Sequence, residues 1–204
     1  MKDALILIDI QNDFCPGGSL AVNEGDQIIP IVNQLQKQFD LVIATQDWHP
    51  ADHISFAANH TNKKVGEFID VNGNPQILWP VHCAQGTHGA DFVEELDMSK
   101  VKKVFQKGTN KQIDSYSGFF DNDHKNSTGL GDYLKLEGVE NVYIVGLATD
   151  YCVKYTVIDA LSLGFNTNVV IDACRGVKLN PNDVENAIQD MEKAGAKIIM
   201  SNSL

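Results

Sequence analysis

The sequence predicts an α/β fold, a three-layer αβα sandwich around an open, mostly parallel sheet of six strands. Short apolar runs alternate with stretches of helical periodicity along the 204 residues. Strands separated by helices of this length pair in parallel through right-handed crossovers. With 43% hydrophobic and 21% charged residues, the composition is ordinary for a globular protein, and we expect one domain over residues 1–204.

The N-terminal half is predicted to contribute three strands and two helices. Residues 4–8 form the first strand, because the run ALILI is typical of a strand buried on both faces. The other predicted elements are a helix over residues 26–39, a second strand over 41–45 (LVIAT), a short helix over 91–96 and a third strand over 103–106 (KVFQ).

The C-terminal half alternates helices and strands more regularly. The predicted elements are helices over residues 130–137, 150–163 and 182–194 and strands over 142–147, 168–171 and 197–200. Each helix is followed by a glycine that can end it: Gly138, Gly164 and Gly195. Two connections, 46–89 and 108–126, are longer than structural loops usually are, so we expect them to carry functional residues.

Charge and cysteine content narrow the class of protein. A net charge of −11 disfavours nucleic acid and anionic membranes as partners, while small neutral substrates stay open. The apolar run near the N-terminus is about seven residues long and contains Asp9, so it does not fit a secretory signal. No stretch approaches the roughly 20 apolar residues of a membrane span. The four cysteines lack CxxC spacing, which predicts reduced thiols in a cytoplasmic protein: Cys15, Cys83, Cys152 and Cys174.

Polar side chains follow four of the predicted strands near their carboxyl ends. They are Asp9, Asp47, Lys107 and Cys152. In an open parallel sheet, ligands bind beyond the carboxyl ends of the strands. An acid, a metal-type cluster, a base and a thiol are therefore expected to meet at one edge of the sheet.

Asp9, Lys107 and Cys152 form a candidate catalytic set, and each has an ordinary alternative. Asp9 is either a general base or a loop cap; burial would raise its pKa, Lys107 would lower it, and the balance is open. Cys152 lies at the start of a predicted helix, where backbone N–H groups and the helix dipole stabilise a thiolate or an oxyanion. Taken alone, Cys152 fits a small core residue equally well, and Lys107 fits a solvated lysine.

A second set of residues is of metal-ligating type. Asp47 and His49 point to the same side of an extended segment, because strand side chains alternate. His53 and His82 lie in the same long connection. Aspartate and histidine suit one divalent cation, for which zinc is the first choice and iron or manganese are alternatives.

Three aromatic residues border these groups: Phe14, Trp79 and Tyr116. Either they are ordinary packing or they form a slot for a flat ring, since aromatic walls stack on aromatic ligands. The second interpretation predicts a small molecule with a flat ring as the ligand.

Six segments, taken in order, resemble the bacterial nicotinamidases and pyrazinamidases of the isochorismatase-like cysteine hydrolase family. They are IDIQNDFCPGGSLAV, TQDWHPADHISF, WPVHCAQGT, FQKGTN, DSYSGFFDN and VGLATDYCVKYTVIDAL. Each piece is a modest signal, but the ordered set is very specific, and it extends from residue 4 to beyond residue 177. One departure is Tyr151, where some relatives have histidine. Residues 59–76 follow no family pattern.

The resemblance implies hydrolysis of nicotinamide to nicotinate and ammonia through a cysteine thioester, in NAD salvage, with pyrazinamide as a further substrate. It implies a catalytic triad of Asp9, Lys107 and Cys152. It also implies an oxyanion hole built from the backbone N–H groups of Ala148 and Cys152, and a cis peptide bond between Leu147 and Ala148.

The resemblance further implies one divalent metal, held by Asp47, His49 and His82. In this family the metal holds the pyridine nitrogen and ordered water and does not generate the nucleophile. Some members use the residue at His53 as a further ligand. The positions that line the ring pocket match Phe14, Trp79 and Tyr116. Whether the protein is a monomer or a homo-oligomer is not predicted.

Other functions stay open at this point. A sister amidohydrolase acting on a carbamoyl or ureido group is disfavoured, because those relatives usually lack the metal set. Isochorismate hydrolysis is disfavoured because it needs no nucleophilic cysteine. Outside hydrolysis, the chain could be an inactive small-molecule binder or a thiol redox sensor. A sensor would need a resolving cysteine near Cys152, for which Cys15 and Cys174 are the candidates.

Overall fold

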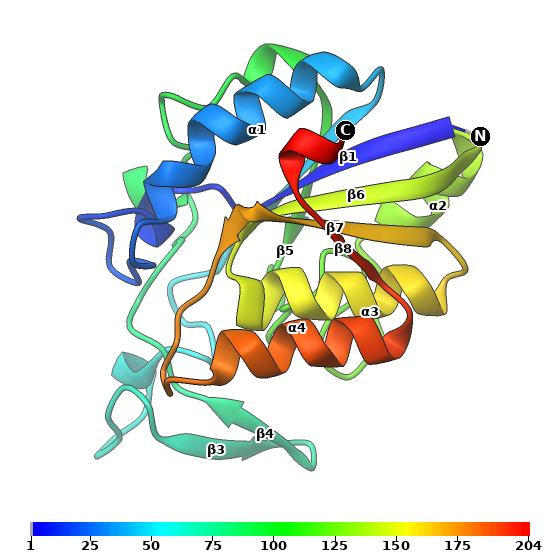
Figure 1. The fold of residues 1–204 in the computed structure, drawn as a ribbon. Helices are drawn as coiled ribbons and strands as arrows, with labels where there is room; N and C mark the ends of the chain where they lie inside the picture. The colour runs from blue at the N-terminus through cyan, green and yellow to red at the C-terminus, as the bar shows by residue number, and fades with distance from the viewer. Residues whose placement is uncertain (1) are drawn as a thin grey trace.

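A sheet of six parallel strands forms the centre of the computed structural model, which describes residues 2–204 (Figure 1). In chain order the strands are β1 (Lys2–Ile8), β2 (Val42–Asp47), β5 (Val101–Lys107), β6 (Val139–Leu147), β7 (Asn166–Arg175) and β8 (Lys197–Ile199). They lie side by side in the order β5-β2-β1-β6-β7-β8, and each neighbouring pair is parallel. The predicted α/β class and the six-stranded parallel sheet are confirmed.

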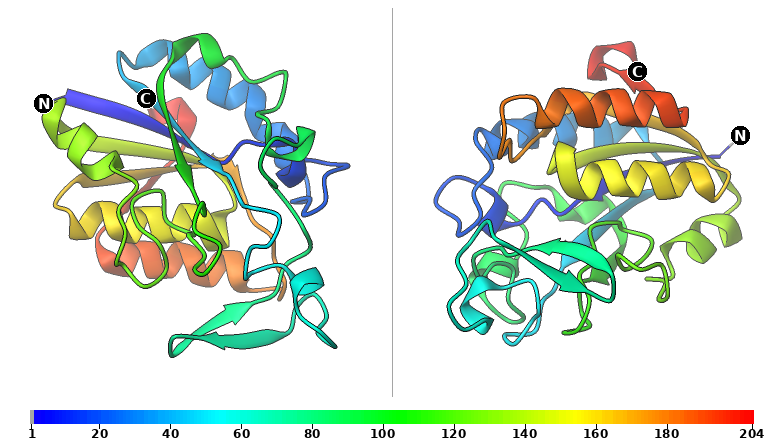
Figure 2. Two further views of the ribbon diagram at one scale, coloured as in Figure 1. Left: turned by 180° about the vertical axis from the view of Figure 1, so that it is seen from behind. Right: turned by 90° about the horizontal axis from the view of Figure 1, so that it is seen from below.

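Helices cover both faces of the sheet (Figures 1 and 2). One face is covered by α1 (Ile29–Leu35), and the other by α2 (Leu130–Leu136), α3 (Lys154–Ser162) and α4 (Asp183–Ala194). Successive residues of β1 divide between the two cores: Leu5 and Leu7 pack on the α1 side, Ile6 and Ile8 on the side of the other three helices. β1 is therefore apolar on both faces, as its sequence predicted.

Two helices of the C-terminal half end close to the glycines that were predicted to end them. Gly195 comes directly after α4 and Gly164 lies two residues after the end of α3, and their φ angles are +111° and +90°. This left-handed conformation carries no steric penalty in glycine, so it ends a helix at little cost.

The predicted helix over residues 26–39 has the right position but not a uniform geometry. It consists of α1 flanked by two 3-10 segments, Gly25–Ile28 and Gln36–Gln38. Tighter turns of this kind are common at helix ends.

The prediction of a short helix over residues 91–96 is wrong. Phe92 pairs antiparallel with Gln11, and the Val93 N–H donates to the carbonyl of Ile10 at 3.2 Å. The backbone groups that a helix would use are therefore bonded to the turn after β1.

A hairpin that was not predicted lies within the long connection of residues 46–89. Its strands are β3 (Phe68–Val71) and β4 (Asn74–Ile77), paired antiparallel, and it stands away from the main sheet (Figure 1). The turn residues Asn72 and Gly73 both have positive φ, +56° and +86°. An Asn-Gly pair is the usual sequence for such a tight turn, so this signal was present in the sequence.

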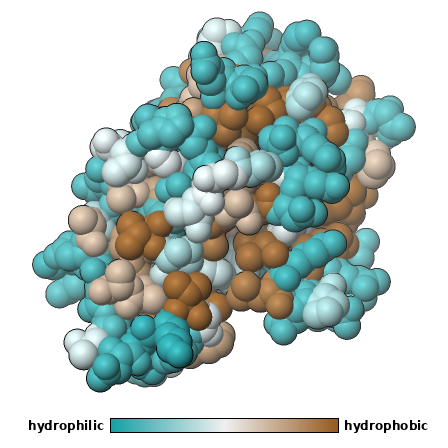
Figure 3. Space-filling model, turned by 90° about the vertical axis from the view of Figure 1, so that its left-hand side faces the viewer, coloured by the Kyte–Doolittle hydropathy of each residue, from teal (hydrophilic) through white to brown (hydrophobic). Residues whose placement is uncertain are grey.

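The strands of the main sheet direct their carboxyl ends to one side of the molecule, which Figure 3 shows face-on. Apolar side chains gather on this side in several patches separated by polar ones (Figure 3). Among residues 2–204, no helix combines the length and the apolar character needed to cross a membrane.

Candidate active site

Asp9, Lys107 and Cys152 meet at the carboxyl edge of the sheet, as their positions predicted. Asp9 follows β1, Lys107 is the last residue of β5, and Cys152 lies in the turn after β6. The Lys107 ammonium nitrogen lies 2.9 Å from Asp9 Oδ2 and 3.5 Å from Cys152 Sγ. All three side chains are buried.

The Asp9 carboxylate is held through one oxygen and left open at the other. Its backbone has a φ angle of +46°, and Thr45 Oγ1 donates to Oδ1 at 2.6 Å. Within residues 2–204, Oδ2 accepts no hydrogen bond, so its contact with Lys107 is a charge contact rather than an aligned bond. Oδ2 therefore keeps a lone pair for the proton of a nearby thiol.

Burial decides the protonation of this group of residues. It raises the pKa of Asp9 above its ordinary value, even though Lys107 opposes the shift, which answers the question left open by the sequence. Burial also raises the pKa of Cys152 well above its usual value, against the opposing effect of Lys107. Burial therefore favours the neutral form of the Cys152 thiol, which requires a base before it can act as a nucleophile.

Lys107 joins the acid and thiol to the candidate metal cluster. In addition to its charge contact with Asp9, Lys107 donates to Asp47 Oδ1 at 2.5 Å and to the Ser115 carbonyl at 2.8 Å. Burial disfavours the ammonium, but the charges of Asp47 and Asp9 outweigh it and raise the pKa of Lys107 well above its usual value. Lys107 thus stays charged and places one positive charge between two buried carboxylates.

The turn that carries Cys152 is a π-helical turn, Thr149–Val153, and the regular helix α3 begins only at Lys154. The Val153 N–H donates to the Ala148 carbonyl, five residues back, at 3.1 Å. Single π turns are frequent at functional sites. The peptide bond between Leu147 and Ala148 is cis, as the family resemblance implied.

Asp47, His49 and His82 offer one ligand atom each within 4.8 Å of one another, and all three are buried. His49 Nδ1 lies 2.9 Å from the Gly108 carbonyl, and His82 Nδ1 lies 2.9 Å from the Pro80 carbonyl. A carbonyl only accepts, so each Nδ1 carries the proton and each Nε2 has a free lone pair.

The free nitrogens converge on one carboxylate oxygen. His49 Nε2 lies 3.4 Å and His82 Nε2 lies 3.9 Å from Asp47 Oδ2. Within the described residues, His49 Nε2 is buried without a hydrogen-bond partner. Burial lowers the pKa of His82 to about 4, so this ring is neutral near pH 7. The charge of Asp47 outweighs burial and raises the pKa of His49, so a cation at this site would displace a proton from that ring. Two imidazoles and a carboxylate fit a divalent cation of the zinc type.

Gly108 is required by the position of His49. A Cβ atom at Gly108 would overlap the His49 ring, and the φ angle of +64° favours glycine as well. This glycine therefore lets the imidazole reach the backbone carbonyl that orients it.

His53 lies beside the cluster but its nitrogens are engaged elsewhere. Nδ1 lies 2.7 Å from Ser55 Oγ and Nε2 lies 3.3 Å from the Ile113 carbonyl. Because that carbonyl accepts, Nε2 is protonated and has no lone pair for a metal. The ring packs on His49 with 4.2 Å between centroids. In this arrangement His53 packs against a candidate ligand, and with His49 and Asp114 it also forms a second buried group of ligand-type side chains.

A narrow pocket opens above the thiol. Its lining includes the three predicted aromatic residues, Phe14, Trp79 and Tyr116, together with Asp47, His82, Ala148 and Cys152. Four further lining residues were not predicted from the sequence: Leu20, Asp114, Tyr151 and Val177. The Trp79 ring meets the edge of Tyr151 at 4.9 Å between centroids, and its Nε1 donates to the Tyr116 hydroxyl at 3.4 Å. The aromatic walls therefore support one another.

Gln76 of the unpredicted hairpin fixes two of these walls. It is buried, and its Nε2 donates to Asp114 Oδ2 and to the Tyr116 hydroxyl, each at 3.1 Å. Gln76 comes from residues 59–76, which follow no family pattern, whereas Leu20 lies within the IDIQNDFCPGGSLAV segment. Tyr151 and Asp114 had a signal, because one adjoins the nucleophile and the other begins the DSYSGFFDN segment.

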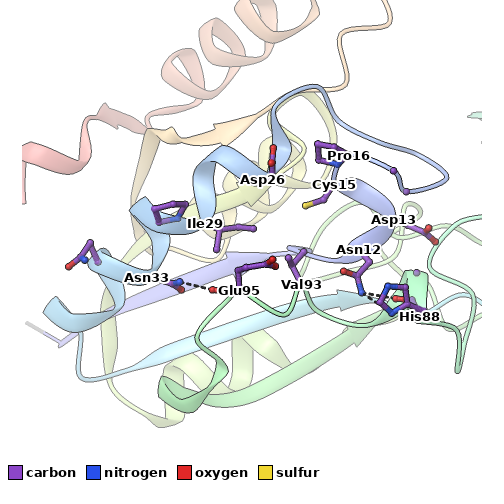
Figure 4. Close-up of a pocket in the computed structure, with 15 residues that line it drawn as sticks. Asn12, Asp13, Cys15, Pro16, Asp26, Ile29, Asn33, His88, Val93 and Glu95 are labelled. Carbon is purple, nitrogen blue, oxygen red and sulfur yellow. Dashed lines mark hydrogen bonds between the residues drawn. The ribbon is translucent and has the colours of Figure 1, made fainter.

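A larger cavity lies elsewhere, between α1 and the turn after β1 (Figure 4). Asp13, Cys15, Asp26 and Glu95 contribute to its lining, and none of Asp9, Lys107 or Cys152 does. Its size is therefore no guide to the chemistry of the protein.

The fold and the relatives are those of an amidohydrolase, and in this chain a thiol, a carboxylate and an ammonium meet at the carboxyl edge of an αβα sheet, next to a metal-type cluster. The chain belongs to the isochorismatase family, whose domain model matches residues 3–203.

Individual relatives narrow the comparison. The chain is 48% identical to a nicotinamidase of Acinetobacter baylyi, over 98% of this chain and 94% of that protein. A solved structure of a nicotinamidase and pyrazinamidase of Acinetobacter baumanii superposes with a TM-score of 0.97 at 48% identity, over 99% of this chain and 97% of the other. A pyrazinamidase of Pyrococcus horikoshii in complex with zinc superposes with a TM-score of 0.79 at 40% identity, over 98% and 99% of the two chains.

Proposed function

We propose that this protein is a nicotinamidase, which hydrolyses the carboxamide of nicotinamide to nicotinate and ammonia and also accepts pyrazinamide. The observation that carries the proposal is the position of Cys152 Sγ, 3.5 Å from Lys107 Nζ and at the floor of an aromatic pocket. The names of the full-length relatives support the same activity.

The first step makes the nucleophile and breaks the amide. Asp9 Oδ2 takes the proton of the Cys152 thiol, while Lys107 stabilises the resulting charges. The sulfur then bonds to the carboxamide carbon, and the carbonyl oxygen becomes an oxyanion. Backbone N–H groups of Ala148 and Cys152 stabilise this oxyanion. Asp9 returns its proton to the nitrogen, the carbon–nitrogen bond breaks, and ammonia leaves.

The second step releases the acid. Asp9, again a carboxylate, takes a proton from a water molecule as the water oxygen attacks the thioester carbon. The carbon–sulfur bond breaks, the sulfur regains its proton through Asp9, and nicotinate leaves. The raised pKa of Asp9 suits both directions of this proton transfer.

Asp47, His49 and His82 would hold one divalent cation, for which zinc is the first choice. When bound, this cation supplies a Lewis-acid position for the pyridine nitrogen and for ordered water. His53 packs on the ring of His49 and keeps its orientation. Phe14, Trp79 and Tyr116 hold the flat ring, which supplies the positioning part of catalysis.

The reaction belongs to the recovery of nicotinamide for NAD synthesis, in the cytoplasm. The four cysteines support that compartment, since all are free thiols in the described chain.

The proposal is tested by ammonia release from nicotinamide, with metal content measured on the same samples. We expect turnover by the native protein, and none by Cys152→Ala at unchanged metal content. Ammonia release that persists in Cys152→Ala would overturn the thioester mechanism. Activity towards an N-carbamoyl compound in place of nicotinamide would overturn the substrate assignment.

A further inference from the structure

We propose that Gln11 and Asp13 are positioning residues that hold the backbone of the metal ligands Asp47 and His82. Both lie in the turn that follows β1, and neither takes part in the steps above. The inference rests on the proposed metal site, but its test measures metal affinity and needs no substrate.

Gln11 is completely buried, and its side chain forms hydrogen bonds with both the N–H and the carbonyl of Asp47. Its Oε1 accepts from the Asp47 N–H at 2.8 Å, and its Nε2 donates to the Asp47 carbonyl at 2.9 Å. A further bond from Nε2 to the Ala90 carbonyl, at 2.8 Å, anchors the amide to a third segment. The side-chain amide of Gln11 thus uses its oxygen and its nitrogen to fix the backbone at and near Asp47.

This contact replaces a strand that has ended. The parallel pairing of β1 with β2 stops at Leu7 opposite Ala44, and β1 turns away at Asp9. Beyond that point the side-chain amide of Gln11 offers the donor and the acceptor that a peptide group of β1 would have offered. Asp47 is therefore held by Gln11 on the side where the ladder with β1 has ended, while on its other side it still pairs with Lys107 of β5.

Asp13 plays the corresponding part for His82. Its Oδ2 accepts from the N–H of Cys83, the residue after His82, at 2.7 Å, and its Oδ1 accepts from the Ser19 N–H at 3.1 Å. The Cys83 carbonyl in turn accepts from the His49 N–H at 3.0 Å. The short segment at Cys83 is thus tied to Asp13 on one side and to the second histidine ligand on the other.

The residues around Asp13 leave room for its hydrogen bond with the Cys83 N–H. Gly89 covers the Asp13 carboxylate so closely that a Cβ at this position would overlap it. Asp13 lies at one end of the cavity beside α1, and its neighbour Asn12 donates to the His88 carbonyl at 2.8 Å (Figure 4). The same cavity has a second carboxylate, Asp26, which makes no side-chain hydrogen bond within residues 2–204 and provides a matched control.

The consequence is measurable as metal affinity. Partners that orient ligands without touching the metal typically cost about 10- to 100-fold in affinity when they are removed. We expect losses of this size for Gln11→Met, which changes no charge, and for Asp13→Asn. Asp26→Asn removes the same charge from the same cavity and should stay within about twofold of the native affinity.

The experiment is a zinc titration of the metal-free proteins against a chromophoric chelator, with the thermal unfolding midpoint of each protein recorded with and without zinc. A positioning role predicts weaker zinc binding and a smaller zinc-induced rise of the midpoint in Gln11→Met and Asp13→Asn. A merely structural role would lower the metal-free midpoint and leave the affinity unchanged, and that result would overturn the inference.

His82→Ala separates this inference from the proposed metal site. Native protein that binds zinc no better than His82→Ala would remove the metal site itself, and the positioning role with it. Native protein that binds zinc tightly, with Gln11→Met and Asp13→Asn equal to Asp26→Asn, would remove only the positioning role.

Discussion

The two halves of the candidate site are supported in different ways. The triad half, which is Asp9, Lys107 and Cys152, lies at the ends of the strands. Asp9 follows β1, Lys107 is the last residue of β5, and Cys152 lies in the turn after β6. The metal half consists of Asp47, His49 and His82. Asp47 is the last residue of β2, while His49 and His82 lie in the long connection that follows this strand.

The difference shows what each half requires from the rest of the chain. Strand ends are placed by the hydrogen bonds of the sheet, so the triad needs few helpers beyond Thr45. The metal ligands rely on side chains and carbonyls from other segments, among them Gln11, Asp13 and Gly108. Lys107 contacts an acid from each half, Asp9 and Asp47.

Replacement of the nucleophile should have the largest effect and should be confined to the triad half. Cys152→Ala is expected to lower kcat by roughly 10⁴-fold or more, because no other group can form the thioester. Zinc content should match the native protein. Steady-state ammonia release and metal analysis check both parts, and a loss of zinc would show that the two halves are not separable.

Lys107→Met tests the link between the halves. It leaves the buried carboxylates of Asp9 and Asp47 uncompensated, which should cost about 3–5 kcal/mol of unfolding free energy. The control is Lys111→Met, which breaks the exposed pair with Asp52 and should cost less than about 1 kcal/mol. Denaturant unfolding measures both, and equal losses would contradict a linking role for Lys107.

His82→Ala should affect the metal half and spare the fold. We expect zinc affinity to fall by more than about 100-fold, since a lost ligand costs more than a lost supporting contact. The thiol should still react with an alkylating reagent at close to the native rate. His60→Ala, a histidine bonded to the Ile54 carbonyl outside the cluster, should bind zinc normally. Normal zinc binding by His82→Ala would exclude this ligand set.

The pH profile reports on Asp9. Since the base must be deprotonated to act and burial raises its pKa, kcat/KM should fall on the acid side with a midpoint above the ordinary aspartate value of about 4. A raised pKa also means that the folded protein binds this proton more tightly. Its contribution to stability is then present at low pH and is lost as the pH rises through the raised pKa. An acid limb at or below pH 4 would rule out a raised pKa.

The smallest predicted effect concerns the hairpin. Gln76→Leu removes the two bonds that hold Asp114 and Tyr116, which should raise KM by about 3- to 10-fold and leave kcat within about twofold. Asn74→Ala, an exposed change in the same strand, should leave both constants unchanged. Steady-state kinetics with nicotinamide decides, and an unchanged KM in Gln76→Leu would show that the hairpin does not shape the pocket.

The sequence by itself determined the sheet, its parallel pairing and the edge at which chemistry gathers. Runs such as ALILI can be buried only as strands covered on both faces, and parallel strands bring their carboxyl ends to one side. Asp9, Lys107 and Cys152 could therefore be placed together from their positions after strands, although their catalytic roles stay predictions.

Tertiary structure decided the rest, because the deciding contacts join residues far apart in the chain. Residues 91–96 are not helical because their backbone bonds to the turn after β1, and burial raises the pKa of the Cys152 thiol against the opposing effect of Lys107. Likewise the contact of His53 Nε2 with the Ile113 carbonyl joins residues 60 positions apart and has no local signal. Hydrogen-bond partners and desolvation are properties of the packed chain, so no local pattern of residue types can specify them.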